Sequence, residues 1–478
     1  MKKLLLAFRK NLGRHIAGLL LVCLLLPMNS CKKFVTVPEP INSITTLETF
    51  SNDATANSEI VGIYSKMASY SESYVNGDIT INSGMSADEF QQFGSPTLFQ
   101  LNNLQTADGS SDLFWTQAYF NIYQANLAIE ALKNSTGVST QMKNQLIGEA
   151  EFIRAFDYFY LVNFYGDVPL VTTTAFAANE TLPRTSVAKV YQLITSDLMD
   201  AQNLLAIDYS VSDGERTRPN KWAAKALLAR VYLYQGDWKD AEAQATSVIN
   251  NSSLYSLTDL NSVFLANSNE AIWQLQPDYT IRRPYTTYEG NSFIPIRATS
   301  NPNYYLTSEL ISAFEPLDQR RTAWVGSTQY AGQFYYYPFK YKIRLGTVGV
   351  VPAENIMVLR LAEQYLIRAE AEANGAGGGV NSAIGDLNVI RSRAGLPSLS
   401  TSLTKDSVLA AIAQERRIEL FAEFGHRWLD LKRTGQATTV LSTEKGFTVS
   451  SNALLYPIPG YELQTDPKLT QNPGYLSK

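Results

Sequence analysis

The sequence is poor in the residues that build most metal and catalytic centres. Its 478 residues include two histidines and two cysteines. Cys23 and His15 lie in the first thirty residues, so Cys31 and His426 are the ones left in the remainder. One cysteine cannot form an internal disulfide, and one histidine argues against histidine-based metal clusters and Ser–His–Asp triads. We predict no cofactor, no metal site and a fold held by its apolar core.

The N-terminal apolar stretch is too short to span a bilayer. Ile16–Leu26 has eleven residues and follows five basic residues, whereas a membrane helix needs about 20. This pattern is typical of a secretory signal, and the PMNSC that follows (residues 27–31) is similar to a bacterial lipobox. We predict that residues 1–30 are removed, that Cys31 is lipidated, and that residues 31–40 form an extended spacer.

The charge of the chain gives no reason to expect binding to nucleic acid. The formal net charge is −4, and it becomes −9 when the five basic residues of the signal are removed. Such a chain is not attracted to nucleic acid or to anionic lipid headgroups. Contact with a membrane should therefore depend on the acyl chains alone.

Beyond the spacer, apolar residues recur with the helical period of 3.6. The stretch 221–249 matches a 34-residue tetratricopeptide unit that begins at Trp222 and turns at Gly236. Its expected packing positions are Leu228, Ala229 and Tyr232 in the first helix and Ala241, Ala245 and Val248 in the second. One such hairpin cannot bury its apolar face alone, so further helical pairs are required.

Three more helical pairs have the same periodicity. They are Thr140–Phe164 with Val187–Leu205, Asp112–Leu132 with Glu48–Tyr70, and Leu361–Asn374 with Val380–Ala394. We predict a mainly α fold in which about four tetratricopeptide-like pairs form a solenoid frame, divided into helical parts at 41–250 and 358–478. The glycine run 375–379 should be an interhelical loop, because no Lys-Ser/Thr follows it as in a phosphate-binding loop.

Two irregular regions interrupt this frame. Residues 76–110 are rich in Asn, Ser, Gly and Gln, and we expect a loop insertion there. Residues 251–357 are short strand-like runs broken by prolines, and residues 279–341 contain ten of the 27 tyrosines. Loops with aromatic tips commonly carry binding sites, so 251–357 is the candidate ligand-binding region.

Three separated stretches carry a resemblance to a known family. They are GEAEFIRAFDYFYLVNFYGDVPL (148–170), LRLAEQYLIRAEAEA (359–373) and ERRIELFAEFGHRWLDLKR (415–433), the last followed by YPIP (456–459) and QNPGY (471–475). With the lipobox, this set resembles the SusD/RagB family of outer-membrane nutrient-binding lipoproteins, whose members are built on tetratricopeptide helices.

The resemblance implies a non-enzymatic lipoprotein on the outer membrane of a Bacteroidetes-type bacterium. It would face the cell exterior, capture a glycan and deliver it to a SusC-like TonB-dependent β-barrel transporter. Cys31 is followed by Lys32 and Lys33 without an acidic cluster, so exposure at the surface is implied by the resemblance alone. Two alternatives stay open: a tetratricopeptide scaffold or peptide-binding lipoprotein and, less favoured, a surface glycoside hydrolase.

A glycan site needs aromatic planes for the C–H faces of sugars and polar side chains for their hydroxyls. The ligand-binding candidates are Tyr285, Tyr288, Asn291, Asn303, Tyr304, Tyr305, Trp324 and Tyr330. Further polar groups are Asn301, Arg282, Arg283 and Asp318, and weaker aromatic candidates are Phe90, Phe93 and Trp115. The alternative is that half of these rings are strand core, as we expect for Trp273.

A dense group of charges near the C-terminus has a structural interpretation. Glu415, Glu419 and Glu423 are four residues apart and so share one helical stripe, where like charges repel. We predict that basic partners such as Arg360 or Arg368 form forks with them, and that they are not a catalytic pair. His426 should be a packing or hydrogen-bonding residue, and the turn at 165–169 should only end a helix.

Overall fold

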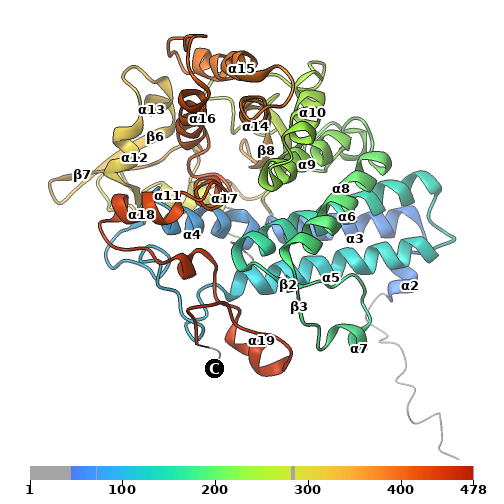
Figure 1. Ribbon diagram of the computed structural model, residues 1–478. Helices are drawn as coiled ribbons and strands as arrows, with labels where there is room; N and C mark the ends of the chain where they lie inside the picture. The colour runs from blue at the N-terminus through green and yellow to red at the C-terminus, as the bar shows by residue number, and fades with distance from the viewer. Residues whose placement is uncertain (1–44, 71–72, 281–285, 477–478) are drawn as a thin grey trace, which may run out of the picture. The chain divides into compact units, whose positions relative to one another are not determined.

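The computed structural model describes residues 45–70, 73–280 and 286–476, and Leu47–Lys478 form one compact unit. The chain is mainly helical with a few short strands, as predicted (Figure 1). The signal, Cys31, the spacer and Tyr285 lie outside the described residues. Among the helices of these ranges, none has both the length and the apolar character needed to cross a membrane.

A row of helices forms the frame of this unit, and each helix packs against the next. In order, they are α5 (Asp112–Asn134), α6 (Thr140–Tyr165), α8 (Val187–Leu204), α9 (Lys221–Gln235), α10 (Trp238–Ile249), α14 (Leu361–Ala373) and α15 (Gly379–Arg393). Three expected pairs are neighbours in this row. The fourth differs, because α5 packs mainly on α6, while α3 (Asp53–Met67) contacts both.

The pair α9 and α10 shows how local sequence positions two helices. Asn220 caps α9 by accepting hydrogen bonds from the N–H groups of Trp222 and Ala223 at 2.9 and 3.0 Å. Gly236 ends α9 with a φ of 74°, a conformation that a residue without Cβ adopts freely. Ala229 and Ala241 are fully buried, so the two helices approach closely.

The α6 helix has more buried residues than any other helix of the frame, and its end also fixes the start of α8. Gly166 ends α6 at a φ of 74°, as the sequence indicated. Asp167 then accepts a hydrogen bond from the N–H of Val187, the first residue of α8, at 2.9 Å. The short strands β2 (Val168–Pro169) and β3 (Arg184–Thr185) pair between the two helices.

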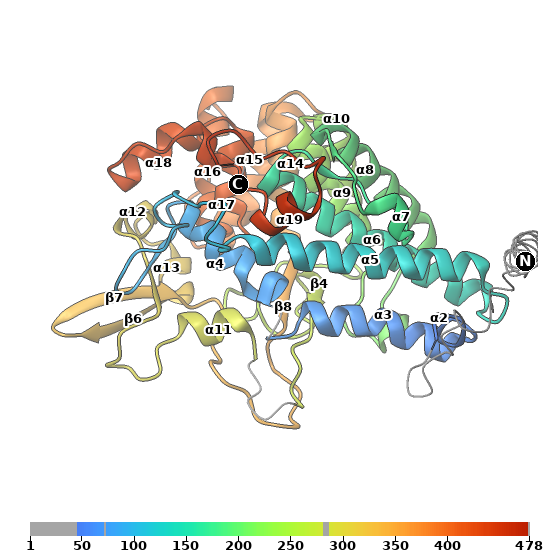
Figure 2. The same ribbon diagram turned by 90° about the horizontal axis from the view of Figure 1, so that it is seen from below.

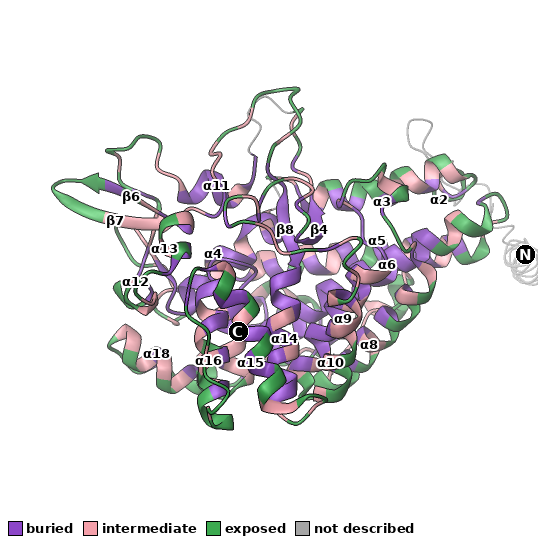
Figure 3. Cartoon of the chain, turned by 90° about the horizontal axis from the view of Figure 1, so that it is seen from above, coloured by how far each residue is buried: buried purple, intermediate pink, exposed green. Residues whose placement is uncertain are grey.

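Residues 251–357 leave the frame as short strands, small helices and loops. The strands are β4 (Ala271–Leu275), β5 (Tyr304–Leu306), β6 (Val325–Tyr330) and β7 (Gln333–Pro338), and the helices are α11 (Tyr288–Phe293), α12 (Ser308–Ala313) and α13 (Gln319–Trp324). β4 pairs with β8 (Ile356–Arg360), and Trp273 in β4 is fully buried, as predicted. The β6–β7 hairpin and α11 project from one side of the frame (Figures 2 and 3).

The region 76–110 is more ordered than a loop insertion. A π-helical turn, η2 (Tyr74–Asp78), leads into α4 (Ile79–Ser86) and then β1 (Phe90–Gln92). Ile79, Ile81 and Met85 are buried, and α4 packs on α17 (His426–Arg433). The polar composition of this region concealed α4, because α4 has few apolar residues.

The remaining helices are α2 (Thr46–Thr49), α7 (Phe176–Asn179), α16 (Lys405–Glu419), α17 (His426–Arg433), α18 (Ala437–Lys445) and α19 (Gly460–Thr465), with 3₁₀ turns at Ser210–Ser212 and Ser451–Leu454.

A buried network of arginines and carboxylates joins the C-terminal helices to the strands. Arg360 at the end of β8 contacts Glu419 at 2.6 Å and Glu423 at 2.7 Å. Glu419 also contacts Arg320 of α13 at 3.0 Å and Arg393 of α15. Burial alone would raise the pKa of Glu419, but the charges of the three arginines hold this pKa well below the usual 4.5.

The network agrees with the structural interpretation of the charge cluster. Arg360 is one of the two predicted partners, whereas Arg368 binds Asp386 at 2.7 Å instead. His426 is buried at the start of α17, with a pKa that burial holds well below its usual value of 6.5. It is therefore a neutral packing residue, as expected.

Two other buried carboxyl groups lie outside this network and keep their protons. Burial raises the pKa of Glu89 and of Glu289 to about 8, and the charges of Asp88 and Glu423, respectively, add to the shift. Glu289 is in α11 and shares side-chain hydrogen bonds with Thr80 and Tyr341. Helix α11, at the base of the projecting loops, thus contacts the core through the protonated carboxyl group of Glu289.

We expect Glu419→Gln to lower the free energy of unfolding by about 3–5 kcal/mol, because three buried guanidinium groups lose their shared counter-charge. Urea denaturation followed by circular dichroism measures this change. Glu180→Gln is the control, since Glu180 is exposed, and it should alter the free energy by about 0.5 kcal/mol at most. Equal stability of the two variants would contradict a structural role for the network.

We also expect stability to depend on the pH through Glu289. In the folded chain its pKa is about 8, against 4.5 for an unperturbed glutamate. Between these values the unfolded chain has lost a proton that the folded chain keeps, so the stability contributed by this group falls as the pH rises from 4.5 through 8. Glu289→Gln should flatten this decline in denaturation curves recorded at pH 5, 7 and 9. A decline as steep as that of the unmodified chain would contradict the protonated state.

Candidate functional site

The projecting β6–β7 hairpin is built to hold its rings in place. Its two strands pair from Val325 with Pro338 to Tyr330 with Gln333. The two connecting residues, Ala331 and Gly332, both have positive φ angles, 49° and 82°. This is the two-residue turn whose twist matches that of paired strands. The hairpin therefore has a defined turn at its tip, where Tyr330 is 39% exposed.

A chain of four rings joins this hairpin to the neighbouring strands. We call Phe93, Tyr305, Tyr330 and Tyr335 the loop-face cluster. The Phe93 ring lies 5.7 Å from Tyr330 and 5.5 Å from Tyr335, and Tyr335 lies 5.2 Å from Tyr305, in each case nearly edge to face. Such contacts are favourable by about 0.5–1.5 kcal/mol each. Pairing of β1 with β5 brings Phe93 and Tyr305 together.

Polar groups accompany these rings. The hydroxyl of Tyr305 donates to Gln91 Oε1 at 2.8 Å. Asn303 is exposed, and its backbone carbonyl accepts from the N–H of Phe93 at 2.9 Å. The Gln91 side chain thus lies beside the rings, and Asn303 is an exposed residue opposite Phe93. Amides of this kind can exchange hydrogen bonds with the hydroxyls of a sugar.

A second aromatic group lies around Tyr288 at the start of α11. Its ring is 5.0 Å from that of Tyr70 and rests on Gly77, where a Cβ would come within 2.3 Å of Tyr288 Cδ1. Burial and the charge of Asp78 raise the pKa of both Tyr288 and Tyr304. Asp78 accepts a hydrogen bond from Ser73 at 2.5 Å. The charge of one carboxylate thus acts on two half-buried tyrosines.

Three of the predicted site residues are held within the protein. Trp324 is fully buried, and its Nε1 donates to the carbonyl of Leu260 at 2.8 Å, so the prediction of an exposed ring is wrong. Its position at the end of α13 turns the ring into the core. Asn291 is buried and donates to the carbonyl of Arg344 at 3.3 Å. Asp318 is buried as well, paired with Arg320 at 2.8 Å.

The other candidates divide between the two aromatic groups. Tyr305 and Tyr330 belong to the loop-face cluster, whereas Tyr288 and Tyr304 belong to the second group. Asn301 and Asn303 are exposed nearby. Tyr285, Arg282 and Arg283 lie outside the described residues. Of the weaker candidates, Phe93 joins the loop-face cluster, while Phe90 and Trp115 are buried in the core.

Sequence reasoning missed Tyr335, Tyr70, Gln91 and Asp78. Tyr335 is one of three consecutive tyrosines at 335–337, and alternation along a strand could have placed it on one face with Gln333. No signal in the sequence points to Gln91, because its position depends on the pairing of β1 with β5. Among the described residues, no group of three or more His, Cys, Asp or Glu side chains is arranged to hold a metal ion.

Two family descriptions match most of the chain. One, "Starch-binding associating with outer membrane", matches residues 32–233, and the other, "SusD family", matches residues 278–475. The second match contains the α11 region, the β6–β7 hairpin and the buried charge network.

Individual relatives agree with these matches. SusD-like protein P2 of Formosa agariphila is 29% identical over 95% of this chain and 98% of its own length. Starch-binding protein SusD of Bacteroides thetaiotaomicron is 23% identical over 79% of this chain and 81% of its own length.

Solved structures share the fold. A SusD superfamily protein from Bacteroides vulgatus has a TM-score of 0.77 at 23% identity, with 89% of this chain and 100% of that chain covered. A laminarin-binding SusD-like protein has a TM-score of 0.71 at 25% identity, with 89% and 100% covered. The sequence matches and the shared helical fold together identify the chain as a member of the SusD/RagB family.

Proposed function

We propose that this chain binds a glycan on its loop-face cluster and delivers it to a SusC-like TonB-dependent β-barrel transporter. The observation that carries the proposal is the chain of rings Phe93, Tyr335 and Tyr305, with Tyr330 at its exposed end. Phe93, Tyr305 and Tyr335 are only partly buried, so part of their surface is open to solvent. A sugar can lay its C–H face on such a surface, and its hydroxyls can reach Gln91 and Asn303.

The relatives support a glycan as the cargo. One is described as a starch-binding protein and one as a laminarin-binding protein. The two names refer to different polysaccharides, so the class of cargo is supported and the individual sugar is left to experiment.

The proposed location is the outer membrane, with the chain anchored through a lipid on Cys31 and facing the exterior. The family description names association with the outer membrane. Capture at the cell surface requires a partner that moves the cargo inward, and a TonB-dependent barrel is the partner that the family resemblance implies. Residues 31–40 would be the spacer between the lipid and the folded unit.

We propose binding without bond cleavage. A retaining or inverting hydrolase needs two carboxyl groups about 5–10 Å apart on either side of the scissile bond. Glu415, Glu419 and Glu423 instead face buried basic side chains. A glycosidase would release reducing ends from a polysaccharide, whereas a binding protein leaves it intact.

Affinity electrophoresis of the full chain in detergent tests the glycan site against starch, laminarin and a wider polysaccharide panel. We expect at least one glycan to retard the chain. Tyr335→Ala and Tyr330→Ala should each weaken this binding by about five-fold, the effect of losing roughly 1 kcal/mol of ring stacking.

Tyr461→Ala is the matched control, because Tyr461 is 70% exposed on α19, away from the loop face. Its mobility shift should equal that of the unmodified chain. Mobility that no glycan changes would favour the scaffold or a peptide cargo. Reducing ends that appear in the same incubation would favour a hydrolase.

The lipid anchor predicts that Cys31→Ala removes fatty-acid labelling. Cells grown with an alkyne fatty acid should label the unmodified chain, because the thiolate of Cys31 is the acceptor, and should leave the variant unlabelled. The variant should also move from the membrane fraction to the soluble fraction, or it should retain its uncleaved signal peptide. Label retained on Cys31→Ala would contradict lipidation at this residue.

A further inference from the structure

A small open pocket lies between β1, the start of α12 and the end of α18. We call it the α18 pocket. Its volume is about 220 Å³, below the range of about 300–1,000 Å³ that is usual for a complete small-molecule site. In Figures 1 and 2, α12 and α18 lie at the same end of the frame as the β6–β7 hairpin. A pocket of this size in this place can hold one part of a larger ligand.

The α18 pocket and the loop-face cluster share a side chain. Gln91 lines the pocket, and its Oε1 accepts the hydrogen bond from the hydroxyl of Tyr305 in the cluster at 2.8 Å. Thr307 and Ser308 of the pocket wall directly follow β5, the strand that contains Tyr305. A chain molecule that lies on the rings can therefore reach into the pocket.

The rim of the pocket is open to solvent and includes an aromatic ring. Phe447 is 38% exposed and Leu101 is 39% exposed, and Glu309 is exposed as well. Gly446 ends α18 with a φ of 71°, and Phe447 follows this turn. An exposed ring beside polar groups matches a sugar, which has a C–H face to stack and hydroxyls around it.

Polar side chains at the pocket complement the hydroxyls of a sugar. The side-chain oxygens of Gln91 and Gln100 already accept hydrogen bonds, that of Gln100 from the N–H of Gln92 at 3.3 Å. Both residues are partly exposed, and their amide nitrogens are left to donate. Glu309 and Glu444 contribute carboxylate oxygens, which only accept. A sugar hydroxyl both donates and accepts, so it can satisfy an amide and a carboxylate together.

Lys445 joins the two walls of the pocket. Its Nζ donates at 2.6–3.0 Å to four oxygens, which are the backbone carbonyls of Met85, Ser86 and Gln100 and the side-chain carbonyl of Asn102. These acceptors lie before and after β1 in the chain, so the end of α18 is tied to both sides of this strand. The pocket is thus formed before a ligand arrives, which lowers the entropic cost of binding.

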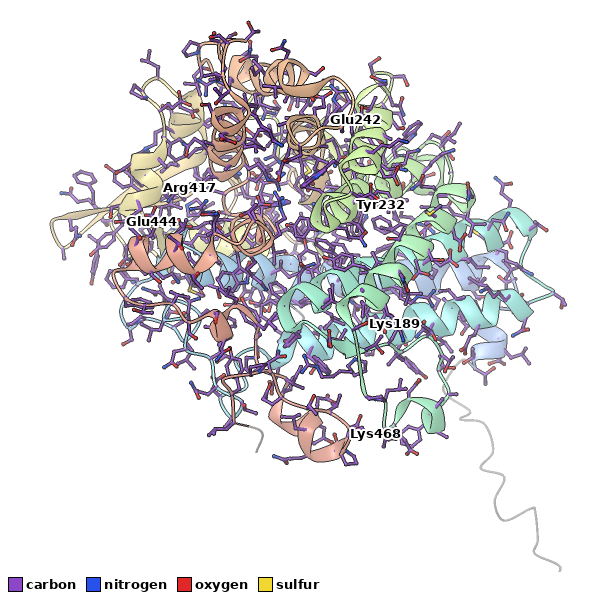
Figure 4. The ribbon with its side chains drawn as sticks, viewed as in Figure 1. Lys189, Tyr232, Glu242, Arg417, Glu444 and Lys468 are labelled. Carbon is purple, nitrogen blue, oxygen red and sulfur yellow. The ribbon has the colours of Figure 1, made fainter. Side chains whose placement is uncertain are left out.

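The charge left open at the rim is negative. Asp88 lies in the wall, but Arg417 and Arg427 bind its two oxygens. Glu444 lies 3.5 Å from Arg417, and Figure 4 shows these two side chains near each other. Among the described residues, no basic side chain forms an ion pair with Glu309. An anionic ligand would therefore meet an uncompensated like charge at Glu309, which is unfavourable.

We propose that the α18 pocket is a second sugar subsite that selects uncharged glycans over glycans with carboxylate or sulfate groups. One sugar stacks on Phe447. Its hydroxyls donate to Glu309 and Glu444 and accept from the two glutamine amides. This inference rests on the proposed binding of a glycan at the loop-face cluster, and it extends that site by a neighbouring contact surface.

Affinity electrophoresis of the full chain in detergent tests the subsite with pairs of neutral polysaccharides and their carboxymethyl derivatives, beginning with starch and laminarin. We expect the neutral member of a pair to bind at least about five-fold more tightly, because the derivative is repelled at the rim. Phe447→Ala should weaken binding of the neutral glycan about five-fold through the loss of one stacking contact. Phe176→Ala is the matched control and should bind as the unmodified chain does, since Phe176 is 77% exposed on α7, far from α18 in Figure 1.

Glu309→Gln tests the selectivity separately from the folding of the pocket. The amide keeps a carbonyl acceptor but loses the charge, so binding of the neutral glycan should change little. Binding of the carboxymethyl derivative should become about three-fold tighter, and this gain should largely vanish in about 0.5 M salt, where charges are screened. Glu180→Gln removes an exposed charge on another part of the chain and should produce no such gain.

The outcomes separate this inference from the proposed function. Binding that Tyr335→Ala weakens and Phe447→Ala leaves unchanged would overturn the subsite and leave the loop-face cluster as the glycan site. Equal or tighter binding of the carboxymethyl derivatives would overturn the selectivity for uncharged glycans. Retardation by none of the polysaccharides would overturn both the subsite and the glycan function.

Discussion

The fold depends on one buried carboxylate, Glu419, on which three arginines converge. Arg320, Arg360 and Arg393 come from α13, β8 and α15, elements that are distant in sequence. An uncompensated buried charge is strongly unfavourable, so these elements must meet in one arrangement for the charges to be balanced. Hydrophobic packing alone tolerates several arrangements of similar helices. The network selects the one in which the strand-rich region sits at a fixed place on the helical frame.

The loop-face cluster is a consequence of that placement. The end of β7 leads into Lys340, which pairs with Glu423 of the same network. The β6–β7 hairpin therefore starts from a fixed base. Its rings pack against Phe93, which comes from a segment much earlier in the sequence. The buried charges thus fix the base from which the aromatic loop face projects.

The features that could be predicted from the sequence are those determined by residues close together in the chain. Helical periodicity, the Asn220 cap and the glycines at 166 and 236 are local signals, and the structure has helices bounded by them. The sequence did not predict features that depend on distant residues. Trp324 and Asp318 are buried by α13 and its arginine, and Gln91 meets Tyr305 across 214 positions of sequence. Composition indicated where the aromatic residues concentrate, but which rings are exposed depends on strand pairing that no local pattern encodes.

In the proposed function, the two-residue turn of the β6–β7 hairpin bears on how quickly and how selectively a glycan would be recognised. Because Tyr330 and Tyr335 are held by Phe93 before any ligand arrives, their conformational entropy is lost when the chain folds and not when the complex forms. A preformed platform of this kind suits brief, repeated encounters with long flexible polymers, which can dissociate and rebind along their length without any rearrangement of the protein.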